Sequence, residues 1–384
     1  MEFLEIELKR IVAHCAVQRR KNVTDIAAMM HEAALDADPA NMYMRLYFIL
    51  SSLGQDEFAL EMQAQALQHR AIFRITDPVK PSVRLLALMS PGDMTDNAPL
   101  DYLLEGHPVR LDLLFVSPGQ ELPSQIPDHD LVFVGMGESE KNSPTFASLM
   151  KLRESWPRPW INAPEKLLNC RRDRLPKLLE VVPGLLAPAC RRWNKQDSGE
   201  FNFPLTIRPI DTHGGKGLEK LNCLEDFHAY LSRHGEIGEF YIADYIDYQS
   251  KDGFFRKARV AIIDRIPYAC HLAISPDWIV HYIPSGMEHS QAKRAEEQSF
   301  MEDFEDQFAR RHAKALLAIA DLTGLDYIII DCWETGAGEL LLFEADGGGW
   351  IHAIDPAEVF PYKAAVMQKA FDGFEAMLLQ KSRA

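Results

Sequence analysis

The chain has 384 residues, of which 47% are hydrophobic and 25% are charged, and its formal net charge is −15. This composition is ordinary for a globular protein and excludes a disordered chain. A chain so acidic is a poor candidate for wrapping duplex nucleic acid or docking on an anionic membrane, so we expect no nucleic acid and no membrane as a partner.

The sequence carries no pattern typical of export or of a cysteine-bound metal. Its first residues place acids within an apolar pattern and lack the apolar core of a signal peptide, and its longest apolar runs are too short to span a bilayer. The six cysteines include no CxxC pair, which indicates reduced thiols. We therefore expect a cytoplasmic protein.

The first 75 or so residues carry helical periodicity only. Three stretches have apolar spacing near 3.6: residues 23–34, 42–53 and 56–68. Gly54, Ala59 and Ala66 lie where a tetratricopeptide-type hairpin has its small residues. We predict a helical, tetratricopeptide-like segment over residues 1–78. Two roles stay open for it, a generic helical cap and a module that binds a peptide or protein partner.

Residues 79–160 have a different pattern, in which β-rich runs replace the helical periodicity. Three β-rich runs occupy residues 83–89, 109–116 and 130–137, and helical or loop segments separate them. This alternation predicts a small α/β layer with parallel strands over residues 79–160. The turn at residues 90–93 follows the first strand, where α/β proteins often place ligand contacts.

The remainder of the chain, residues 161–384, reads as α+β. Strands are predicted over residues 203–210, 239–246, 258–264, 267–274, 278–283, 325–333 and 339–346. Helices are predicted over residues 164–179, 298–322 and 362–379. Hairpin-length gaps between consecutive strands predict antiparallel sheets.

A group of carboxylates stands out near the end of the chain. Asp331 and the pair Glu344 and Asp346 sit in two strands joined by a short turn, so a hairpin would bring them together. Three converging carboxylates are costly unless a cation neutralises them, and such oxygen ligands suit Mg²⁺, or Mn²⁺ in its place. An acidic surface hairpin is the alternative interpretation.

Cationic residues form a second group. Arg208 sits in an apolar strand just before a glycine-rich loop at residues 211–217, whose N–H groups and Lys216 suit a phosphate. Further cations cluster at Arg171, Arg172, Arg174 and Lys177, and at Arg256, Lys257 and Arg259. Strand alternation places Lys257 and Arg259 on one face and Arg256 on the other. We interpret Arg171 and Arg172 as solvated charges on a helix. For Arg256, the alternative to a role in the site is a salt bridge on the surface.

The order and spacing of these motifs resemble the ATP-grasp superfamily, in particular its RimK-like and D-alanine–D-alanine ligase-like branch. Five segments carry the resemblance: residues 160–174, 203–217, 239–247, 253–263, and 325–331 with 341–346. It covers about residues 81–379. It implies an α+β fold of two lobes clasping ATP, a small lobe at about 168–240 and a large lobe at about 241–384, preceded by a pre-ATP-grasp α/β layer.

The resemblance also implies roles for individual residues. The residues implied to bind ATP are Arg174, Arg208, His213, Gly214, Gly215, Lys216, Asp244, Tyr245 and Ile246. Asp331, Glu344 and Asp346 would hold Mg²⁺. Arg259 would stabilise an acyl phosphate with Arg256 as its partner, and Lys216 would close over the γ-phosphate.

This sequence departs from the family pattern at several positions. Arginine replaces the usual lysine at Arg174 and Arg208, and Ile329 stands where many ligases have an arginine. The residues after the metal motif are replaced by Gly347–Trp350. Substrate recognition there cannot be carried over from the family.

The resemblance implies ATP-dependent ligation of a carboxylate to an amine through an acyl phosphate, on small-molecule or peptide substrates. Two alternatives stay open, an ATP-grasp phosphotransferase and a nucleotide-binding module whose helical N-terminus holds a peptide. Whether the chain forms a homodimer also stays open.

Overall fold

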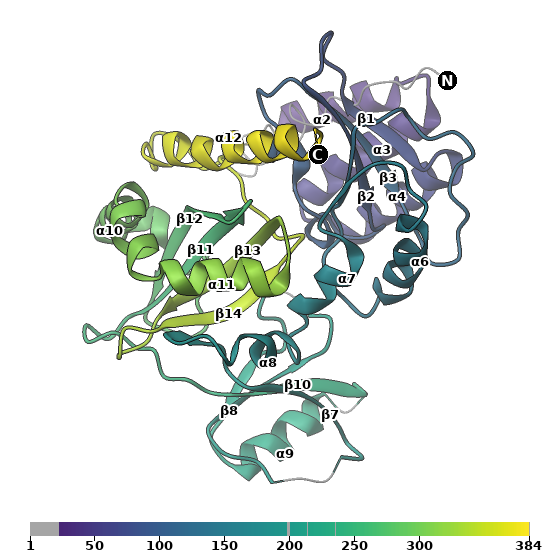
Figure 1. The fold of residues 1–384 in the computed structure, drawn as a ribbon. Helices are drawn as coiled ribbons and strands as arrows, with labels where there is room; N and C mark the ends of the chain where they lie inside the picture. The colour runs from purple at the N-terminus through teal and green to yellow at the C-terminus, as the bar shows by residue number, and fades with distance from the viewer. Residues whose placement is uncertain (1–22, 198–199, 213, 235, 384) are drawn as a thin grey trace.

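The computed structural model describes residues 23–197, 200–212, 214–234 and 236–383. Figure 1 shows three bodies of secondary structure along the molecule. Helices and a mixed sheet from the first part of the chain lie at one end, a small sheet with one helix lies at the other, and a larger sheet lies between them.

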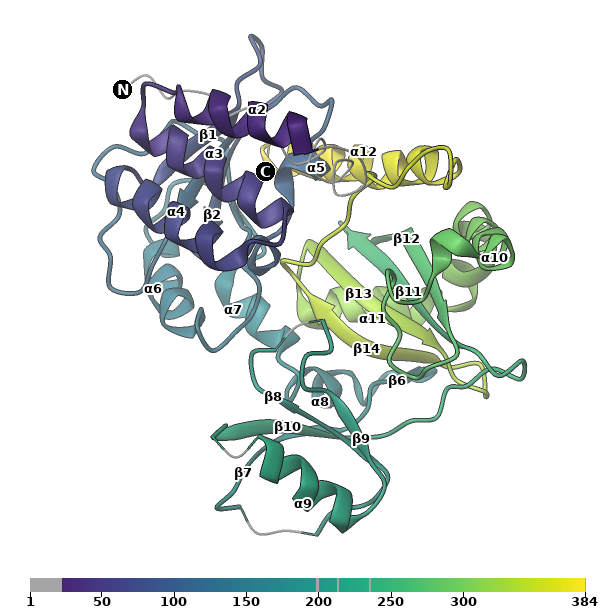
Figure 2. The ribbon, with the colours of Figure 1, turned by 180° about the vertical axis from the view of Figure 1, so that it is seen from behind.

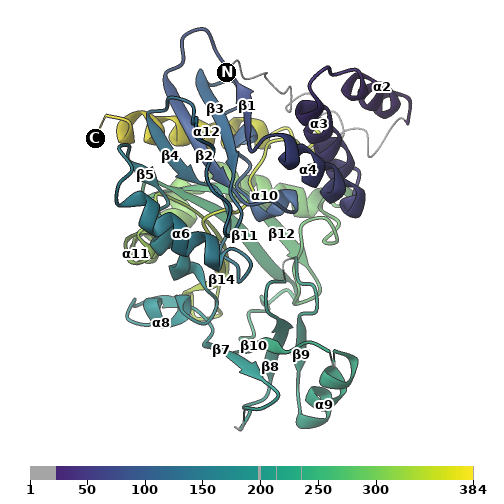
Figure 3. The same ribbon diagram turned by 90° about the vertical axis from the view of Figure 1, so that its right-hand side faces the viewer.

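Three helices open the described chain, α2 (Val23–Ala34), α3 (Pro39–Ser52) and α4 (Asp56–His69). The predicted helices are therefore confirmed, and α3 begins where the Asp38 side chain accepts a hydrogen bond from the Ala40 N–H. Ala59 and Ala66 are buried, which lets α3 and α4 approach closely. The three helices cover one side of the first sheet, as Figures 2 and 3 show from two directions.

The first sheet has the strand order β1-β3-β2-β4-β5. Its strands are β1 (Ile72–Thr76), β2 (Val83–Met89), β3 (Val109–Phe115), β4 (Leu131–Val134) and β5 (Trp160–Ile161). Strands β2 to β5 run parallel, as predicted, with α5 (Leu100–Leu103) and α6 (Ser143–Arg153) in the connections. The expectation of helices alone before residue 75 is wrong at β1, because the alternating side chains there pair antiparallel with β3.

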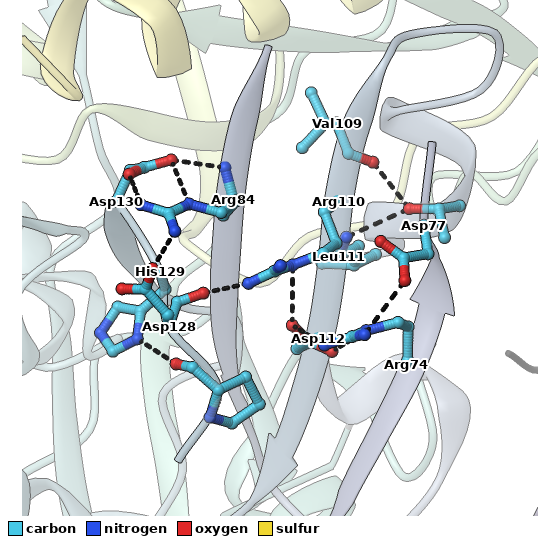
Figure 4. Close-up of polar contacts among 12 residues, drawn as sticks. Arg74, Asp77, Arg84, Val109, Arg110, Leu111, Asp112, Asp128, His129 and Asp130 are labelled. Carbon is cyan, nitrogen blue, oxygen red and sulfur yellow. Dashed lines mark hydrogen bonds and ion pairs between the residues drawn. The ribbon is translucent and has the colours of Figure 1, made fainter. Parts of the chain in front are cut away.

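A buried carboxylate links the edge strand β1 to its neighbour β3. Asp112 of β3 lies opposite Arg74 of β1, and the two side chains approach to 2.8 Å. Arg110 approaches the same carboxylate at 3.4 Å. Figure 4 shows this arrangement beside a second pair, Arg84 with Asp130. Each cation therefore offsets the cost of placing a carboxylate within the sheet.

The small lobe is an antiparallel sheet of order β7-β10-β8-β9. Its strands are β7 (Cys190–Asn194), β8 (Leu205–Pro209), β9 (Glu219–Leu221) and β10 (Glu239–Asp244). Helix α9 (Leu224–Arg233) covers it and buries Phe227 and Tyr230 against Trp193 and Phe240. This lobe therefore has a separate aromatic core.

The large lobe has the strand order β12-β11-β13-β14-β6. Its strands are β6 (Leu185–Leu186), β11 (Phe255–Ile263), β12 (Ile266–Ser275), β13 (Tyr327–Glu334) and β14 (Leu340–Asp346). Its helices are α10 (Gln291–Glu302), α11 (Ala313–Thr323) and α12 (Lys363–Lys381). Phe374 of α12 packs on Phe133 of β4 and Tyr327 of β13, with ring centroids 5.7 and 5.4 Å away. Helix α12 thus joins the large lobe to the first sheet.

Two predicted long helices are wrong as single helices. The segment predicted over 164–179 consists of α7 (Pro164–Leu167), a 3₁₀ turn and α8 (Leu175–Leu179). Pro176 explains the break, because it cannot donate a hydrogen bond to the carbonyl four residues earlier. The segment predicted over 298–322 is interrupted by a π-helical turn at Glu305–Ala309. That turn keeps Phe308 stacked on Trp333 in the core.

The predicted strand at 278–283 is also wrong, since these residues form a loop between β12 and α10. Two of its carbonyls accept hydrogen bonds from side chains. The Tyr248 hydroxyl donates to the Trp278 carbonyl, and the Ser285 hydroxyl donates to that of His281.

Among the helices of the described residues, none has both the length and the apolar character needed to cross a membrane.

Candidate active site

A cavity of about 340 Å³ lies where the small and large lobes face each other. Strands β8 and β10 line it from one lobe, and β11, β13 and β14 line it from the other. Ten of the residues predicted from the sequence belong to its lining: Arg208, Gly214, Gly215, Asp244, Tyr245, Ile246, Arg259, Asp331, Glu344 and Asp346. The fold therefore collects residues that lie up to about 140 positions apart in the sequence.

One end of the cavity is formed by the segment that follows β10. Tyr245 lies there between two partners, Lys220 with its Nζ 3.6 Å from the ring centroid and Trp278 with its ring 5.6 Å away. Burial raises the pKa of the Tyr245 hydroxyl. Aromatic side chains of this kind suit a flat, heteroaromatic ring system.

Asp331 is the most enclosed acid of the cavity, with a side chain only 2% exposed. It lies opposite Arg259 in the β11–β13 pair, and the guanidinium donates two hydrogen bonds to it at 2.8 and 3.1 Å. Lys257 Nζ approaches at 3.0 Å. Burial alone would raise the pKa of Asp331, but the charges of Arg259 and Lys257 hold it well below its usual range.

Glu344 lies directly across the β13–β14 hairpin from Asp331. The predicted side-by-side placement is therefore confirmed for these two acids. Arg172 donates a hydrogen bond to Glu344, and against the effect of burial its charge lowers the pKa of that carboxyl. Asp346 lies two pairs further along, opposite Ile329, and accepts a hydrogen bond from the Gly348 N–H at 2.8 Å.

These acids do not form a metal cage by themselves. Within the described ranges, no three His, Cys, Asp or Glu side chains are grouped closely enough to hold a metal ion. Asp331 and Glu344 are nevertheless cross-strand neighbours on the cavity wall. Since Mg²⁺ in proteins is usually held by one or two carboxylates plus substrate phosphates, this pair fits an ion that shares its ligands with a bound polyphosphate.

Arg208 faces the cavity from β8 of the small lobe and is buried. Its guanidinium donates to the carbonyl and the hydroxyl of Thr212, at the start of the glycine-rich loop. Burial, with Arg172 close by, lowers the pKa of Arg208 to about 10. Two crowded cations in a partly closed cavity are a strong electrostatic attraction for a phosphate group.

The glycine-rich loop is held from both sides. Asp211 accepts hydrogen bonds from the N–H groups of Glu140 and Lys141 in the segment after β4, at 3.0 to 3.3 Å. Gly215 has a φ of +73°, and a Cβ there would lie 2.5 Å from His281 Nε2. Only glycine therefore fits where the loop meets the 276–286 segment of the large lobe.

Neither a family model nor a curated protein matches the sequence. Among solved structures, the D-alanine–D-alanine ligase from Coxiella burnetii is similar, with a TM-score of 0.50 and 9% identity over 78% of this chain and 95% of that chain. The chain has the ATP-grasp fold. At this identity the likeness concerns the fold and not the substrate.

Two further ATP-grasp structures are similar at lower TM-scores. The D-alanine–D-alanine ligase from Bacillus anthracis, solved with ATP, gives 0.48 at 13% identity over 78% of this chain and 96% of that chain. A RimK domain ATP-grasp protein from Sphaerobacter thermophilus gives 0.45 at 13% identity over 78% and 100%.

Three predicted residues lie away from the ATP-grasp cavity lining. Arg174 is exposed at the start of α8, and Lys216 is exposed on the glycine-rich loop. Arg256 points to the other face of β11, as strand alternation predicts, where it pairs with Asp252 and Glu296. His213, another predicted ATP-binding residue, lies outside the described residues.

The lining also contains residues that the motifs did not assign. Arg172 belongs to it, so its interpretation as a solvated helix charge is wrong: the helix breaks after Cys170, and the broken segment turns Arg172 toward Glu344. Pro176 is the sequence signal that indicates this break. Glu138, just after β4, lines the cavity too, and burial raises its pKa to about 7, partly offset by Arg171.

Proposed function

We propose that this chain is an ATP-dependent carboxylate–amine ligase. The observation that carries the proposal is the cavity between the lobes, in which the neighbouring acids Asp331 and Glu344 lie among the cations Arg172, Arg208, Lys257 and Arg259. Alternating charges of this kind suit a ligand that brings both phosphate groups and a metal ion.

We expect ATP to lie in the cavity with its adenine at one end and its phosphates at the other. The segment Asp244–Ile246 would receive the adenine ring, with Tyr245 beside it. Arg208 and Arg172 would then face the phosphates from the small-lobe side. Asp331 and Glu344 would hold Mg²⁺, and the ion would supply charge neutralisation on the phosphates.

The chemistry needs two displacements. A carboxylate oxygen of one substrate attacks the γ-phosphorus, and ADP leaves with the electron pair of the broken P–O bond. The amine nitrogen of the second substrate attacks the resulting acyl carbon, phosphate leaves with the C–O electron pair, and the proton that the nitrogen loses goes to the departing phosphate. Arg259 is placed to stabilise the acyl phosphate, because Asp331 and the Trp350 carbonyl fix its guanidinium in one orientation.

A second candidate is a nucleotide-binding module without turnover. The pairing of both acids with protein cations favours it, since Lys257 and Arg172 already neutralise Asp331 and Glu344. Under this alternative the chain would bind ATP and release no ADP.

The test is to incubate the chain with Mg-ATP and a library of amino acids and dipeptides, and to measure ADP, phosphate and product mass together. A ligase releases one ADP and one phosphate for each new amide, whereas a phosphotransferase keeps the phosphate on its product. Glu344→Gln is expected to lower the rate by at least about a hundredfold, while Glu358→Gln, an exposed control, leaves it unchanged. Near-normal turnover in Glu344→Gln would show the metal assignment to be wrong.

A further inference from the structure

The helices α3 and α4 hold the backbone of a single residue, Gly92, in the loop that follows β2. The Tyr47 hydroxyl donates to the Gly92 carbonyl at 2.8 Å. The Gln63 amide makes two further hydrogen bonds there, as donor to the same carbonyl at 3.2 Å and as acceptor from the Gly92 N–H at 2.8 Å. Both side chains are buried, at 2% and 3% exposure.

The loop that carries Gly92, residues 90–97, is itself closed. The Asn97 side chain accepts from the Ser90 N–H at 2.7 Å and donates to the Ser90 carbonyl at 2.9 Å. Asp93 caps the 3₁₀ turn at Met94–Asp96. A loop tied at its ends and capped within moves as one piece, so whatever holds Gly92 also places the rest of it.

The other side of this loop supports the candidate active site. The Trp350 indole N–H is shared between the carbonyls of Met94, at 3.0 Å, and Asn97, at 2.8 Å. The Trp350 carbonyl accepts a hydrogen bond from Arg259 Nη1 at 3.0 Å. Arg259 in turn holds Asp331. Hydrogen bonds and the closed loop therefore connect the helices to the cavity without interruption.

The contact of α3 and α4 with Gly92 is made by polar side chains, Tyr47 and Gln63. A buried amide and a buried hydroxyl are costly unless their partners are accurately placed, and an apolar pair of similar size would pack the same interface. Polar side chains there add geometric definition to the position of Gly92. The helices are thus built against the loop in a manner that fixes its place, in addition to covering the sheet.

We propose that Tyr47 and Gln63 are positioning residues for the active site, acting through loop 90–97 on Trp350 and through Trp350 on Arg259. The helical segment is then part of the catalytic unit and not a separate appendage. The kinetic part of this inference rests on the proposed ligase function, whereas the link from Gln63 to Trp350 does not.

The link is tested by nuclear magnetic resonance of the chain with isotope-labelled tryptophan. The Trp350 indole signal is assigned by its loss in Trp350→Phe. In Gln63→Leu and in Tyr47→Phe we expect this indole proton to change its chemical shift and to exchange with solvent at least about tenfold faster. The control Gln68→Leu, on the exposed side of α4, and the control Tyr43→Phe of α3 leave the signal in place.

An unchanged Trp350 indole in folded Gln63→Leu and Tyr47→Phe would overturn the proposal. Tyr47→Phe removes one hydroxyl only, so it covers the case in which Gln63→Leu does not fold. The chemical shift of the indole proton reports its hydrogen bond in the folded chain, whereas its exchange rate also rises with a general loss of stability, so the chemical shift decides the outcome.

The kinetic consequence is tested by a double-mutant cycle on the ligase rate. Gln63→Leu and Trp350→Phe are each expected to lower kcat about tenfold with KM for ATP within about twofold, and the double variant is expected to be no slower than the slower single one. Losses that multiply would overturn the coupling. Absence of ADP release by the unaltered chain would contradict the proposed function, and the indole signal would still decide this inference.

Discussion

Two buried carboxylates in this molecule have nearly the same surroundings. Asp112 of β3 is held by Arg74 and Arg110, and Asp331 of β13 is held by Arg259 and Lys257. Each side chain is 2% exposed, each lies in a strand, and each has an arginine directly opposite on a neighbouring strand. By charge and burial alone they are equivalent.

They differ in what lies beyond the ion pairs. Asp331 lines the cavity between the lobes and has a second acid, Glu344, across the hairpin. Asp112 has a leucine, Leu86, as its neighbour on β2. A buried ion pair is therefore weak evidence of function, whereas a second acid and open volume beside it indicate a ligand site.

The largest expected difference between the two acids is in turnover. Asp331→Asn is expected to lower ATP-dependent ADP release by about a thousandfold, because it removes a metal ligand and the anchor of Arg259. Asp112→Asn is expected to leave the rate per folded molecule within about twofold. The measurement is the initial rate with Mg-ATP, normalised to folded protein. Equal losses in both variants would remove the functional distinction between the two acids.

The second expected difference is in stability, in the opposite order. Asp112→Asn removes the buried carboxylate that Arg74 and Arg110 share and leaves Arg74 only the more exposed Asp77, so it is expected to lower the free energy of unfolding by about 3 kcal/mol. Asp331→Asn is expected to cost only about 1–2 kcal/mol, because Glu344 and water in the cavity can take up its two cations. Urea unfolding of both variants measures the difference, and a larger loss for Asp331→Asn would contradict it.

The sequence predicted the parts of the site that depend on strand periodicity. Asp331 and Glu344 could be placed together because a hairpin has a period of two, and the same rule separates Arg256 from Lys257 and Arg259. Strand alternation is a local rule, and tertiary packing did not alter it. The two lobes clasping ATP were implied by the resemblance to the ATP-grasp superfamily and not by a local rule.

The parts that failed depend on contacts between distant segments. Arg172 reaches Glu344 only because a predicted helix breaks, and Trp278 lines the cavity from a loop whose apolar pattern imitates a strand. Glu138 carries no motif, and only the folded structure brings it to the cavity wall. The contacts of Gln63 with Gly92 likewise join two segments that no sequence rule pairs.

The smallest expected effect concerns another acid, Glu138. Burial disfavours its charged form and raises its pKa to about 7. Because its pKa is higher in the folded chain than in the unfolded one, the neutral form stabilises the fold below the ordinary carboxyl range, and this contribution is lost as the pH rises through about 7. For Asp331, with its lowered pKa, the contribution is present above that range and is lost in acid.

Glu138→Gln therefore serves as the pH-independent reference. Between about pH 5 and 8 the free energy of unfolding of the unaltered chain is expected to fall by about 1–2 kcal/mol relative to this variant. Urea unfolding across that range measures the difference. Parallel pH curves for the two proteins would show that Glu138 is ionised at neutral pH, and would leave a further negative charge in the cavity for the cations Arg171 and Arg172 to offset.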